Sequence, residues 1–305
     1  MSGPRPRYLS FVHDSARWDG FKFRAGDIII STPPKCGTTW MQMICSLLIF
    51  QDPEREQRLA MISPWLDMLV KKRDAVYALL EAQAHRRFIK THTPLDGLPE
   101  DDRVTYVCVG RDPRDVAVSW DNHQANLDMD AFLAVRAKAV GTEGLEELVA
   151  LDPPFYADTL RERFWHWVDN PAAVVHATCS LRSTLDHFDQ ALRASERPNV
   201  VVFHYADLKA DLGGEMRRVA DRLGISVPDD RWPALVAAAS FERMRSRADE
   251  LAPNTSDGIW KENRQFFHSG TGGHWREFFD DEAQRRYDAR VVELAAPAVA
   301  SWAHH

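Results

Sequence analysis

The residues best suited to chemistry lie in a short loop, Ser31 to Trp40, between an apolar β-branched run and an apolar run with helical spacing. Such a loop gathers unpaired backbone N–H groups at the positive end of a helix dipole, where they favour an anion. Lys35 adds a positive charge, and Thr38 and Thr39 add hydroxyl donors. Gly37 lets the backbone approach a ligand closely. The loop is therefore predicted to bind a phosphate or sulfate ester.

The order of residues in this loop differs from that of a Walker A loop. A Walker A loop places its lysine directly after its second glycine, whereas Lys35 stands two residues before the only glycine here. The bound ester therefore need not be ATP.

A second cluster, Lys90-Thr91-His92, ends another apolar run. Residues two apart in a strand face the same side, so Lys90 and His92 point together. A histidine beside a lysine suits a general base next to a charge clamp. Taken alone, such a pair is more often a solvated strand end.

A third cluster begins at Arg111, where another apolar run gives way to a helix. Asp112 is a suitable N-cap for that helix and Pro113 suits its first position. Ser119 lies about two turns further on, roughly on the side that the strand end faces. The cluster predicts a second anion site, although in isolation it equally fits a surface Arg–Asp pair with a helix serine.

The glycine-rich segment Phe266 to Trp275 is bracketed by aromatic residues. It fits a loop that folds over a ligand, or a simple turn.

The elements that must position these clusters follow from hydrophobic patterning. Near-continuous apolar runs, typical of strands buried on both faces of a parallel sheet, span Asp27–Thr32, Arg87–Thr91, Val104–Gly110 and Asn199–Tyr205. Helical patterns follow at Thr38–Phe50, Pro113–Asn122 and Leu208–Leu223. This alternation predicts an α/β fold with a central, mostly parallel sheet flanked by helices and a P-loop-like phosphate-binding loop. The helical stretch Gln124–Pro198 is expected to form a cap over the sheet, and the ligand is expected at the carboxyl ends of the strands.

Length and composition favour an ordinary globular enzyme or binding protein. The 305 residues, 45% of them hydrophobic, are expected to form one domain over residues 1–305. A net charge of −7 argues against a nucleic-acid partner. Four cysteines without C-x-x-C pairing indicate free thiols and a cytoplasmic location. No signal peptide or transmembrane run is evident, which leaves peripheral contact with lipid open.

Together the clusters resemble the cytosolic-type sulfotransferases, which move a sulfuryl group from 3′-phosphoadenosine-5′-phosphosulfate (PAPS) to an acceptor hydroxyl and release 3′-phosphoadenosine-5′-phosphate (PAP). The resemblance covers nearly the whole chain, with the motifs in the family's order. The matching segments are Thr32–Trp40, Lys90–His92, Arg111–Ser119, Phe203–Leu208, Ser240–Met244 and Gly270–Trp275. Phe88–Gly97, Gly110–Ser119 and Ala252–Trp260 look closest to bacterial glycolipid sulfotransferases, which points to a glycolipid or another lipophilic alcohol or phenol as acceptor.

The resemblance also implies roles for individual residues. His92 would deprotonate the acceptor, and Lys35 and Lys90 would stabilise charge on the sulfuryl and phosphate oxygens. The implied donor-binding set is Lys35, Cys36, Gly37, Thr38, Thr39, Trp40, Arg111, Ser119, Tyr205, Phe241, His268, Ser269 and Gly270. Within it, Lys35, Thr38 and Thr39 would hold the 5′-phosphate, Arg111 and Ser119 the 3′-phosphate, and Trp40, Tyr205 and Phe241 the adenosine. No metal is required, because the bisphosphate is already a good leaving group.

Some positions depart from the family pattern. Cys36 stands where a serine is frequent, which removes a hydroxyl donor. His268-Ser269-Gly270 aligns with the family's Arg-Lys-Gly, so two phosphate-binding charges are missing, each worth about 1.5–3 kcal/mol if desolvated. Arg264 is a candidate substitute. The family's C-terminal dimer motif is not recognisable, so the sequence leaves the oligomeric state open.

Two functional interpretations from different classes follow. The chain is a sulfotransferase, or it is a non-enzymatic nucleotide-binding protein of the same fold with weakened donor binding. Retention of Lys35, Lys90 and His92 favours the enzyme, since a binding protein needs no base. An ATP-dependent kinase ranks third, because the Walker order and an obvious carboxylate for magnesium are both missing.

Overall fold

Four short parallel strands form the centre of the protein, described here from a computed structural model that covers residues 4–56, 58–268 and 270–305. The strands are β1 (Ile28–Ser31), β2 (Phe88–Thr91), β3 (Thr105–Gly110) and β4 (Val200–His204). Each lies within one residue of the run that predicted it. The patterning reasoning therefore identified all four strands and their parallel arrangement.

The sheet order is β2-β1-β3-β4, and every neighbouring pair is parallel. The carboxyl ends of the four strands therefore meet at one edge. The chain leaves β1 toward β2 on one side, whereas β3 and β4 lie on the other side. The crevice between the ends of β1 and β3 is thus the topological switch point, where ligands bind in open α/β sheets.

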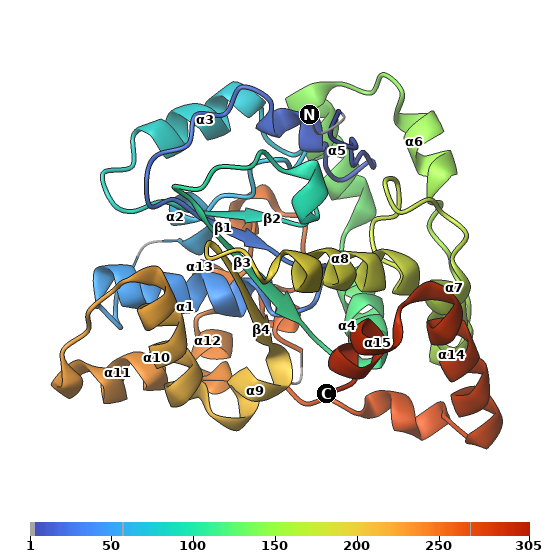
Figure 1. Ribbon diagram of the computed structural model, residues 1–305. Coiled ribbons are helices and arrows are strands. Elements are labelled where there is room, and N and C mark those ends of the chain that lie inside the picture. The colour runs from blue at the N-terminus through green and yellow to red at the C-terminus, as the bar shows by residue number, and fades with distance from the viewer. Residues whose placement is uncertain (1–3, 57, 269) are drawn as a thin grey trace.

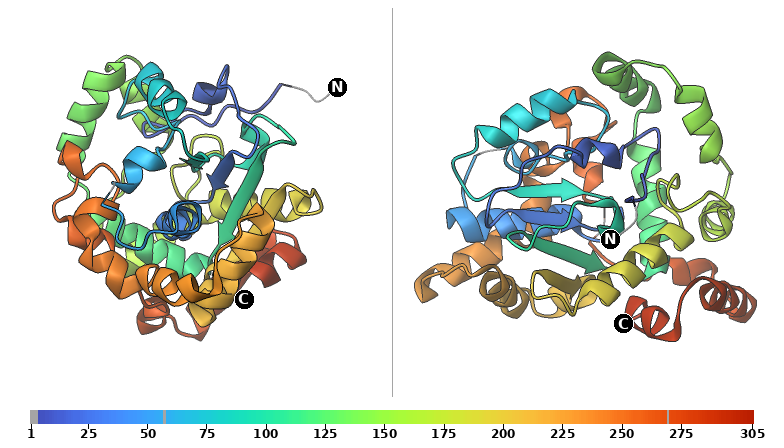
Figure 2. Two further views of the ribbon diagram at one scale, coloured as in Figure 1. Left: turned by 90° about the vertical axis from the view of Figure 1, so that its left-hand side faces the viewer. Right: turned by 45° about the horizontal axis from the view of Figure 1, so that its top comes forward.

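Alternate residues of each strand pack on opposite faces of the sheet. Ile28 and Ile30 join a core formed with α1, whereas Ile29 joins a second core with residues of α3 and α8. Figures 1 and 2 show the resulting layers, with helices on both faces of the sheet. Burial on both faces explains why the strands are almost entirely apolar.

Fifteen α-helices are present in the described residues. They are α1 (Thr38–Phe50), α2 (Leu59–Ile62), α3 (Arg73–Glu81), α4 (Pro113–Asn126), α5 (Met129–Val140), α6 (Leu145–Leu151), α7 (Leu160–Asp169), α8 (Leu181–Ala194), α9 (Tyr205–Ala210), α10 (Leu212–Leu223), α11 (Trp232–Ala238), α12 (Phe241–Ser246), α13 (Ala248–Leu251), α14 (Asp281–Leu294) and α15 (Pro297–Ala303). The predicted bounds of α1 are correct. Helix α4 starts at Pro113 as predicted, capped by the Asp112 side chain, but continues four residues beyond the predicted end at Asn122.

The predicted helix Leu208–Leu223 is wrong as a single element. The chain forms α9 and α10 instead, with Asp211 in a non-helical conformation between them. The Asp211 side chain accepts a hydrogen bond from Gly214 N at 2.8 Å and so caps the second helix. Tyr205, predicted to end a strand, is the first residue of α9.

The predicted helical cap over Gln124–Pro198 holds for only part of that stretch. Helices α5 and α6 contribute to a small core with Phe11 and Met68, beyond the sheet. Helix α8 instead belongs to the layer on the sheet, where its His187 Nε2 lies 3.0 Å from Ser31 Oγ. The apolar face of α8 packs against the sheet. Helix periodicity predicts that such a face exists but does not specify which part of the protein it packs against.

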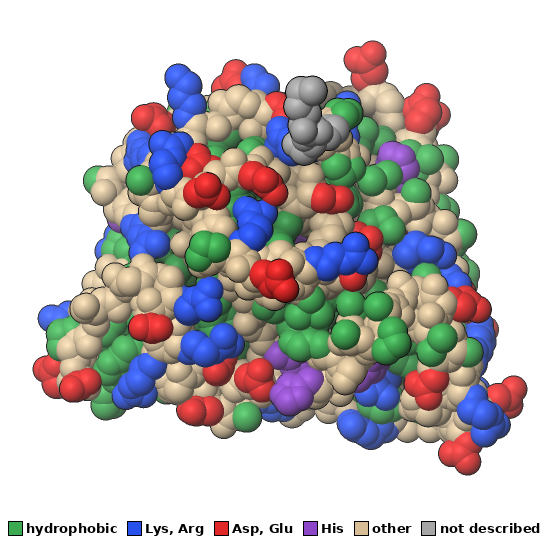
Figure 3. Space-filling model, viewed as in Figure 1, with side chains coloured by type: hydrophobic (Ala, Val, Ile, Leu, Met, Phe, Trp, Pro, Cys, Tyr) green, Lys and Arg blue, Asp and Glu red, His purple; other side chains and the backbone are tan. Residues whose placement is uncertain are grey.

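Charged side chains of both signs are interspersed over the face in Figure 3, with no broad basic area on it. Among the described residues, no helix is both long and apolar enough to cross a bilayer.

Candidate active site

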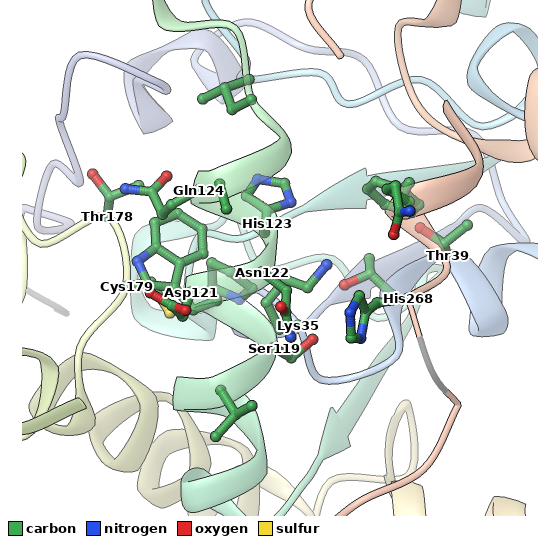
Figure 4. A pocket seen from close by; sticks show the side chains of 18 of the residues that line it. Lys35, Thr39, Ser119, Asp121, Asn122, His123, Gln124, Thr178, Cys179 and His268 are labelled. Carbon is green, nitrogen blue, oxygen red and sulfur yellow. The ribbon is translucent and has the colours of Figure 1, made fainter. Parts of the chain in front are cut away.

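A cavity of about 1300 Å³ opens at the carboxyl ends of the strands. Residues predicted from separate parts of the sequence line it together, namely Lys35, Gly37, Thr38, Thr39, Trp40, Lys90, His92, Arg111, Ser119, Tyr205, Phe241, His268 and Gly270. Figure 4 shows Lys35 of the loop before α1, Thr39 of α1, Ser119 of α4 and His268 gathered around this space. The predicted Ser269 lies outside the described residues. The fold thus brings the separate clusters into one site.

The loop after β1 turns sharply to place its backbone beneath the cavity. Lys35 has a φ of 67° and Gly37 a φ of 94°, both in the left-handed region. A Cβ at Gly37 would stand 3.1 Å from the ring of Tyr205, so the turn needs glycine for space as well as for conformation. No side chain caps α1, so its first N–H groups are left for a ligand.

Cys36 differs from its neighbours in this loop. Its side chain is fully buried in a core with residues of α4, α7 and α8, and it does not line the cavity. Burial raises the pKa of the Cys36 thiol well above its ordinary value. Any contact between Cys36 and a donor would therefore come from its backbone.

His92 lies just past the end of β2 and is fixed by one hydrogen bond. Its Nδ1 is 2.7 Å from the carbonyl oxygen of Thr32, sixty residues away in the chain. A carbonyl oxygen only accepts, so Nδ1 carries the proton and donates, and Nε2 carries a lone pair. Burial, together with the charge of Lys90, holds the pKa of His92 well below its ordinary value. His92 is therefore a neutral imidazole with the tautomer that a general base requires.

The buried Lys90 and the half-buried Lys35 share the cavity with His92. The ammonium of Lys35 lies 4.7 Å from the centre of the Phe266 ring, and that of Lys90 lies 4.4 Å from the centre of a Trp65 ring. Burial lowers the pKa of Lys35 to about 8, and the charge of Arg111 contributes. Burial and the charge of Lys35 lower the pKa of Lys90 to about 7. An aromatic face lies against each ammonium group, and neither lysine forms an ion pair with a carboxylate of the described residues.

Arg111 follows β3 at the switch point and reaches toward the first loop. Its Nη1 donates to Lys35 O at 3.1 Å, and its guanidinium lies 4.5 Å from the centre of the Tyr205 ring. Its Nε is buried and has no hydrogen-bond partner among the described residues. A buried guanidinium N–H without an acceptor fits an anionic group supplied by a ligand.

Aromatic residues enclose the side of the cavity near α1 and α12. Trp40 donates its indole N–H to Ala239 O at 2.8 Å, and its ring is 5.1 Å from that of Tyr205. Phe241 also lines the cavity, and Gly270, with a φ of 65°, packs against its ring. These flat faces could hold a planar base.

A carboxylate holds the segment Gly270–Trp275, which we call the closing segment. Gly273 N donates to Asp115 Oδ1 at 2.6 Å, which ties the segment to α4. His268 is exposed and lines the cavity, whereas Arg264 is exposed and is not one of the described lining residues. Near this segment the cavity lining therefore includes His268 and not Arg264, the candidate substitute.

The family model described as a sulfotransferase domain matches residues 25–296 of the chain. The chain belongs to the sulfotransferase family.

Close relatives of this sulfotransferase are mycobacterial enzymes. It is 43% identical to the glycolipid sulfotransferases of Mycobacterium bovis (strain BCG / Pasteur 1173P2) and Mycobacterium tuberculosis (strain ATCC 25618 / H37Rv), over 97% of this chain and 93% of each relative. Sulfotransferase 1A1 of Rattus norvegicus is 26% identical over 88% of this chain and 84% of its own length. The chain is therefore a sulfotransferase enzyme, and the interpretation as a non-enzymatic binding protein loses its support.

Solved structures share the fold of this sulfotransferase at low sequence identity. Retinol dehydratase, in a complex with retinol and PAP, has a TM-score of 0.69 and 21% identity, covering 92% of this chain and 84% of its own. Mouse sulfotransferase SULT7A1, complexed with PAP, has a TM-score of 0.68 and 18% identity, covering 95% and 92%. The predicted α/β architecture is thus confirmed.

Sequence reasoning missed two anchoring carboxylates of this sulfotransferase. Asp115 holds the closing segment through Gly273 N. Asp67 is fully buried, and its Oδ2 accepts from the hydroxyl groups of Thr91 at 2.7 Å and Thr93 at 2.6 Å, the residues on either side of His92. No local pattern marks Asp67, because its partners are more than twenty residues away in the chain.

Proposed function

We propose that this sulfotransferase transfers a sulfuryl group from PAPS to a hydroxyl of a lipophilic acceptor and releases PAP. The proposal rests chiefly on His92. Its protonated Nδ1 is held by Thr32 O, so its Nε2 lone pair is available in a cavity that also contains Lys35 and Lys90. This is the combination of base and positive charge that sulfuryl transfer needs.

The residues of the site fit the donor's charge. The 5′-phosphate would lie on the first turn of α1 with Lys35, Thr38 and Thr39, where the helix is uncapped. The unpartnered Nε of Arg111 would meet the 3′-phosphate, together with Ser119. Trp40 and Phe241 would enclose the adenine. When bound, PAPS supplies an activated sulfuryl group on a good leaving group.

The chain's own residues would carry out the proton transfer and charge stabilisation. The acceptor's hydroxyl oxygen attacks the sulfur of PAPS, and the bond between that sulfur and the 5′-phosphate oxygen breaks. His92 Nε2 accepts the proton that leaves the hydroxyl. Lys90 and Lys35, as ammonium groups, stabilise the negative charge that develops on the sulfuryl oxygens and on the departing phosphate. Alignment of the reactants in the cavity supplies much of the remaining acceleration.

The acceptor side of the cavity favours a lipophilic molecule. Phe11, Met68, Phe132 and Ile259 form an apolar wall there. The relatives at 43% identity are named glycolipid sulfotransferases, which supports a glycolipid as one such acceptor. The four cysteines are buried free thiols, which agrees with a reducing compartment such as the cytoplasm.

Binding and transfer experiments test this function. Calorimetry is expected to give tighter binding of PAP than of ATP. Radiolabelled PAPS is expected to label hydroxylated glycolipids, sterols or phenols offered as acceptors. ATP binding equal to or tighter than PAP binding would contradict the donor, and labelling of none of the three acceptor classes would contradict the proposed acceptor chemistry.

A further inference from the structure

A second imidazole, His123, faces the cavity from α4 (Figure 4). Unlike the Nδ1 of His92, the Nδ1 of His123 is buried and has no hydrogen-bond partner among the described residues. Because no protein group holds this nitrogen, the ring can turn about its Cβ–Cγ bond and present either nitrogen to the cavity without losing a bond there. The proposed sulfuryl transfer does not use this side chain.

His123 lies among aromatic rings close to the reacting groups. It stacks on Trp120 with ring centres 5.1 Å apart and planes at 18°, and it meets Trp260 edge-on at 4.9 Å. It is also 6.2 Å from Phe266, the ring that carries the ammonium of Lys35. Burial and the charges of Lys35 and Lys90 hold its pKa well below the ordinary value, so the ring is neutral.

Trp65 offers a similar unused group in the same cavity. Its Nε1 is buried without a partner among the described residues. Its ring centre is 4.5 Å from that of His92, and the ring lies under the ammonium of Lys90. His123 and Trp65 therefore each have a ring nitrogen without a hydrogen-bond partner among the described residues, and both rings lie in the cavity that contains His92 and Lys90.

Buried polar atoms without partners are uncommon in folded proteins, and at a cavity wall a bound water, ion or ligand can supply the missing bond. A neutral imidazole offers one donor and one acceptor, and an indole offers one donor. In an acceptor with a single hydroxyl, that hydroxyl would hydrogen-bond to His92. The nitrogens of His123 and Trp65 would then have no hydrogen-bond partner on the acceptor. An acceptor ring with several hydroxyls on its edge and C–H groups on its faces would satisfy the nitrogens and pack on the aromatic faces.

We propose that His123 is a specificity-determining residue that hydrogen-bonds a second oxygen of the acceptor, so that the preferred acceptor carries a polyhydroxylated ring such as a sugar. The inference rests on the proposed function and narrows its acceptor class. His92 takes the proton of the hydroxyl that is sulfated, and His123 fixes a neighbouring oxygen.

Two probes with the same alkyl chain test this inference, octyl β-D-glucopyranoside and 1-octanol. Their dissociation constants are measured by calorimetry on the PAP-saturated enzyme and on the enzyme alone. The wild type is expected to bind the glucoside more tightly. His123→Phe keeps a flat ring and removes the nitrogens, and it is expected to weaken glucoside binding about tenfold, the value of one neutral hydrogen bond, with octanol and PAP binding unchanged.

Turnover separates specificity from a structural role. With the glucoside, His123→Phe is expected to raise KM and leave kcat within about twofold, and His123→Gln is expected to recover part of the loss. Trp65→Phe removes the second unpartnered N–H and is expected to give the same selective loss, which keeps the test valid if His123→Phe does not fold.

Three results would overturn the inference. These are equal binding of both probes by the wild type, equal weakening of both probes by His123→Phe, and unchanged glucoside binding in His123→Phe and Trp65→Phe. Failure of the proposed function has a different signature, namely no preference for PAP over ATP and no sulfuryl transfer, whatever the order of probe binding on the enzyme alone.

Discussion

At the scale of single residues, contacts with segments distant in the sequence set the protonation states of the titratable side chains in the cavity. His92 is a neutral imidazole because Thr32 O fixes its tautomer and burial disfavours its charged form. Burial brings the pKa of Lys35 down to about 8 and that of Lys90 to about 7, so near pH 7 Lys35 is mostly charged and Lys90 is charged in about half of the molecules. A bound anion would favour the charged form of both lysines.

Replacing His92 tests the assignment of the base. His92→Ala is expected to lower kcat by about two or more orders of magnitude, because the group proposed to take the acceptor proton would be removed. PAP affinity is the control and should stay close to that of the wild type. Turnover within about threefold of the wild type would show that another group is the base.

The lysine pKa values predict how PAP affinity changes with pH. At pH 6 both ammonium groups are charged in the free enzyme, whereas at pH 9 both are largely neutral, since their pKa values are about 8 and 7. PAP should raise both pKa values, so its binding takes up protons and weakens as the pH rises from 7 to 9, by up to about tenfold per pH unit for each lysine. Calorimetry in buffers of different ionisation enthalpy measures the uptake, and a constant affinity over this range would contradict it.

At the scale of elements, the strand, loop and helix around Gly37 form one unit that places backbone N–H groups and Lys35 under the cavity. The left-handed turn and the nearby Tyr205 ring fix its shape. The closing segment reaches the same cavity through the bond between Gly273 N and Asp115. We therefore expect donor binding to depend on the conformation of these short segments as well as on their charges.

Gly37→Ala tests the loop, and Gly20→Ala is its matched control. Gly37 has a φ of 94° and an added Cβ there would meet the Tyr205 ring, whereas Gly20 has a φ of 82° and open space around it. Both substitutions should cost about 1–2 kcal/mol of stability from left-handed strain. Only Gly37→Ala should also weaken PAP binding, by about tenfold or more, as measured by calorimetry. Equal PAP affinity in the two variants would contradict the role of this turn.

At the scale of the whole molecule, the end of the chain packs against the centre of the fold. Trp302 of α15 lies over Gly110 at the end of β3, and its ring is 5.2 Å from those of Phe188 and His204. A Cβ at Gly110 would overlap this indole. The glycine before Arg111 thus allows a distant helix to cover the sheet beside the site.

Gly110→Ala is expected to lower the free energy of unfolding by about 1–3 kcal/mol, because the indole must move. In Gly110→Ala/Trp302→Ala the overlap is gone, so the double variant should lose less than the sum of the two single losses. Urea unfolding followed by circular dichroism measures these values. Strict additivity would show that the two residues do not interact.

The sequence by itself determined the strands, the loop between β1 and α1 and the start of α4. Each is set by local rules, namely the burial period of a strand, the exposed N–H groups of a helix start, and an Asp-Pro cap. It also predicted that residues from separate segments meet in one cavity, because the carboxyl ends of parallel strands meet at one edge. Local rules missed the break at Asp211, where a side chain competes with the helix for a backbone N–H.

Only the tertiary structure decided which polar atoms are hydrogen-bonded within the described part of the protein and which are not. The Nδ1 proton of His92, the anchoring of its strand end by Asp67 and the placement of α8 on the sheet all depend on contacts between distant segments. Arg111, Trp65 and His123 each have a nitrogen without a partner among the described residues, which depends equally on the packing around it. A sequence specifies which donors and acceptors exist, whereas folding decides which of them are satisfied within the protein and which are left for a ligand.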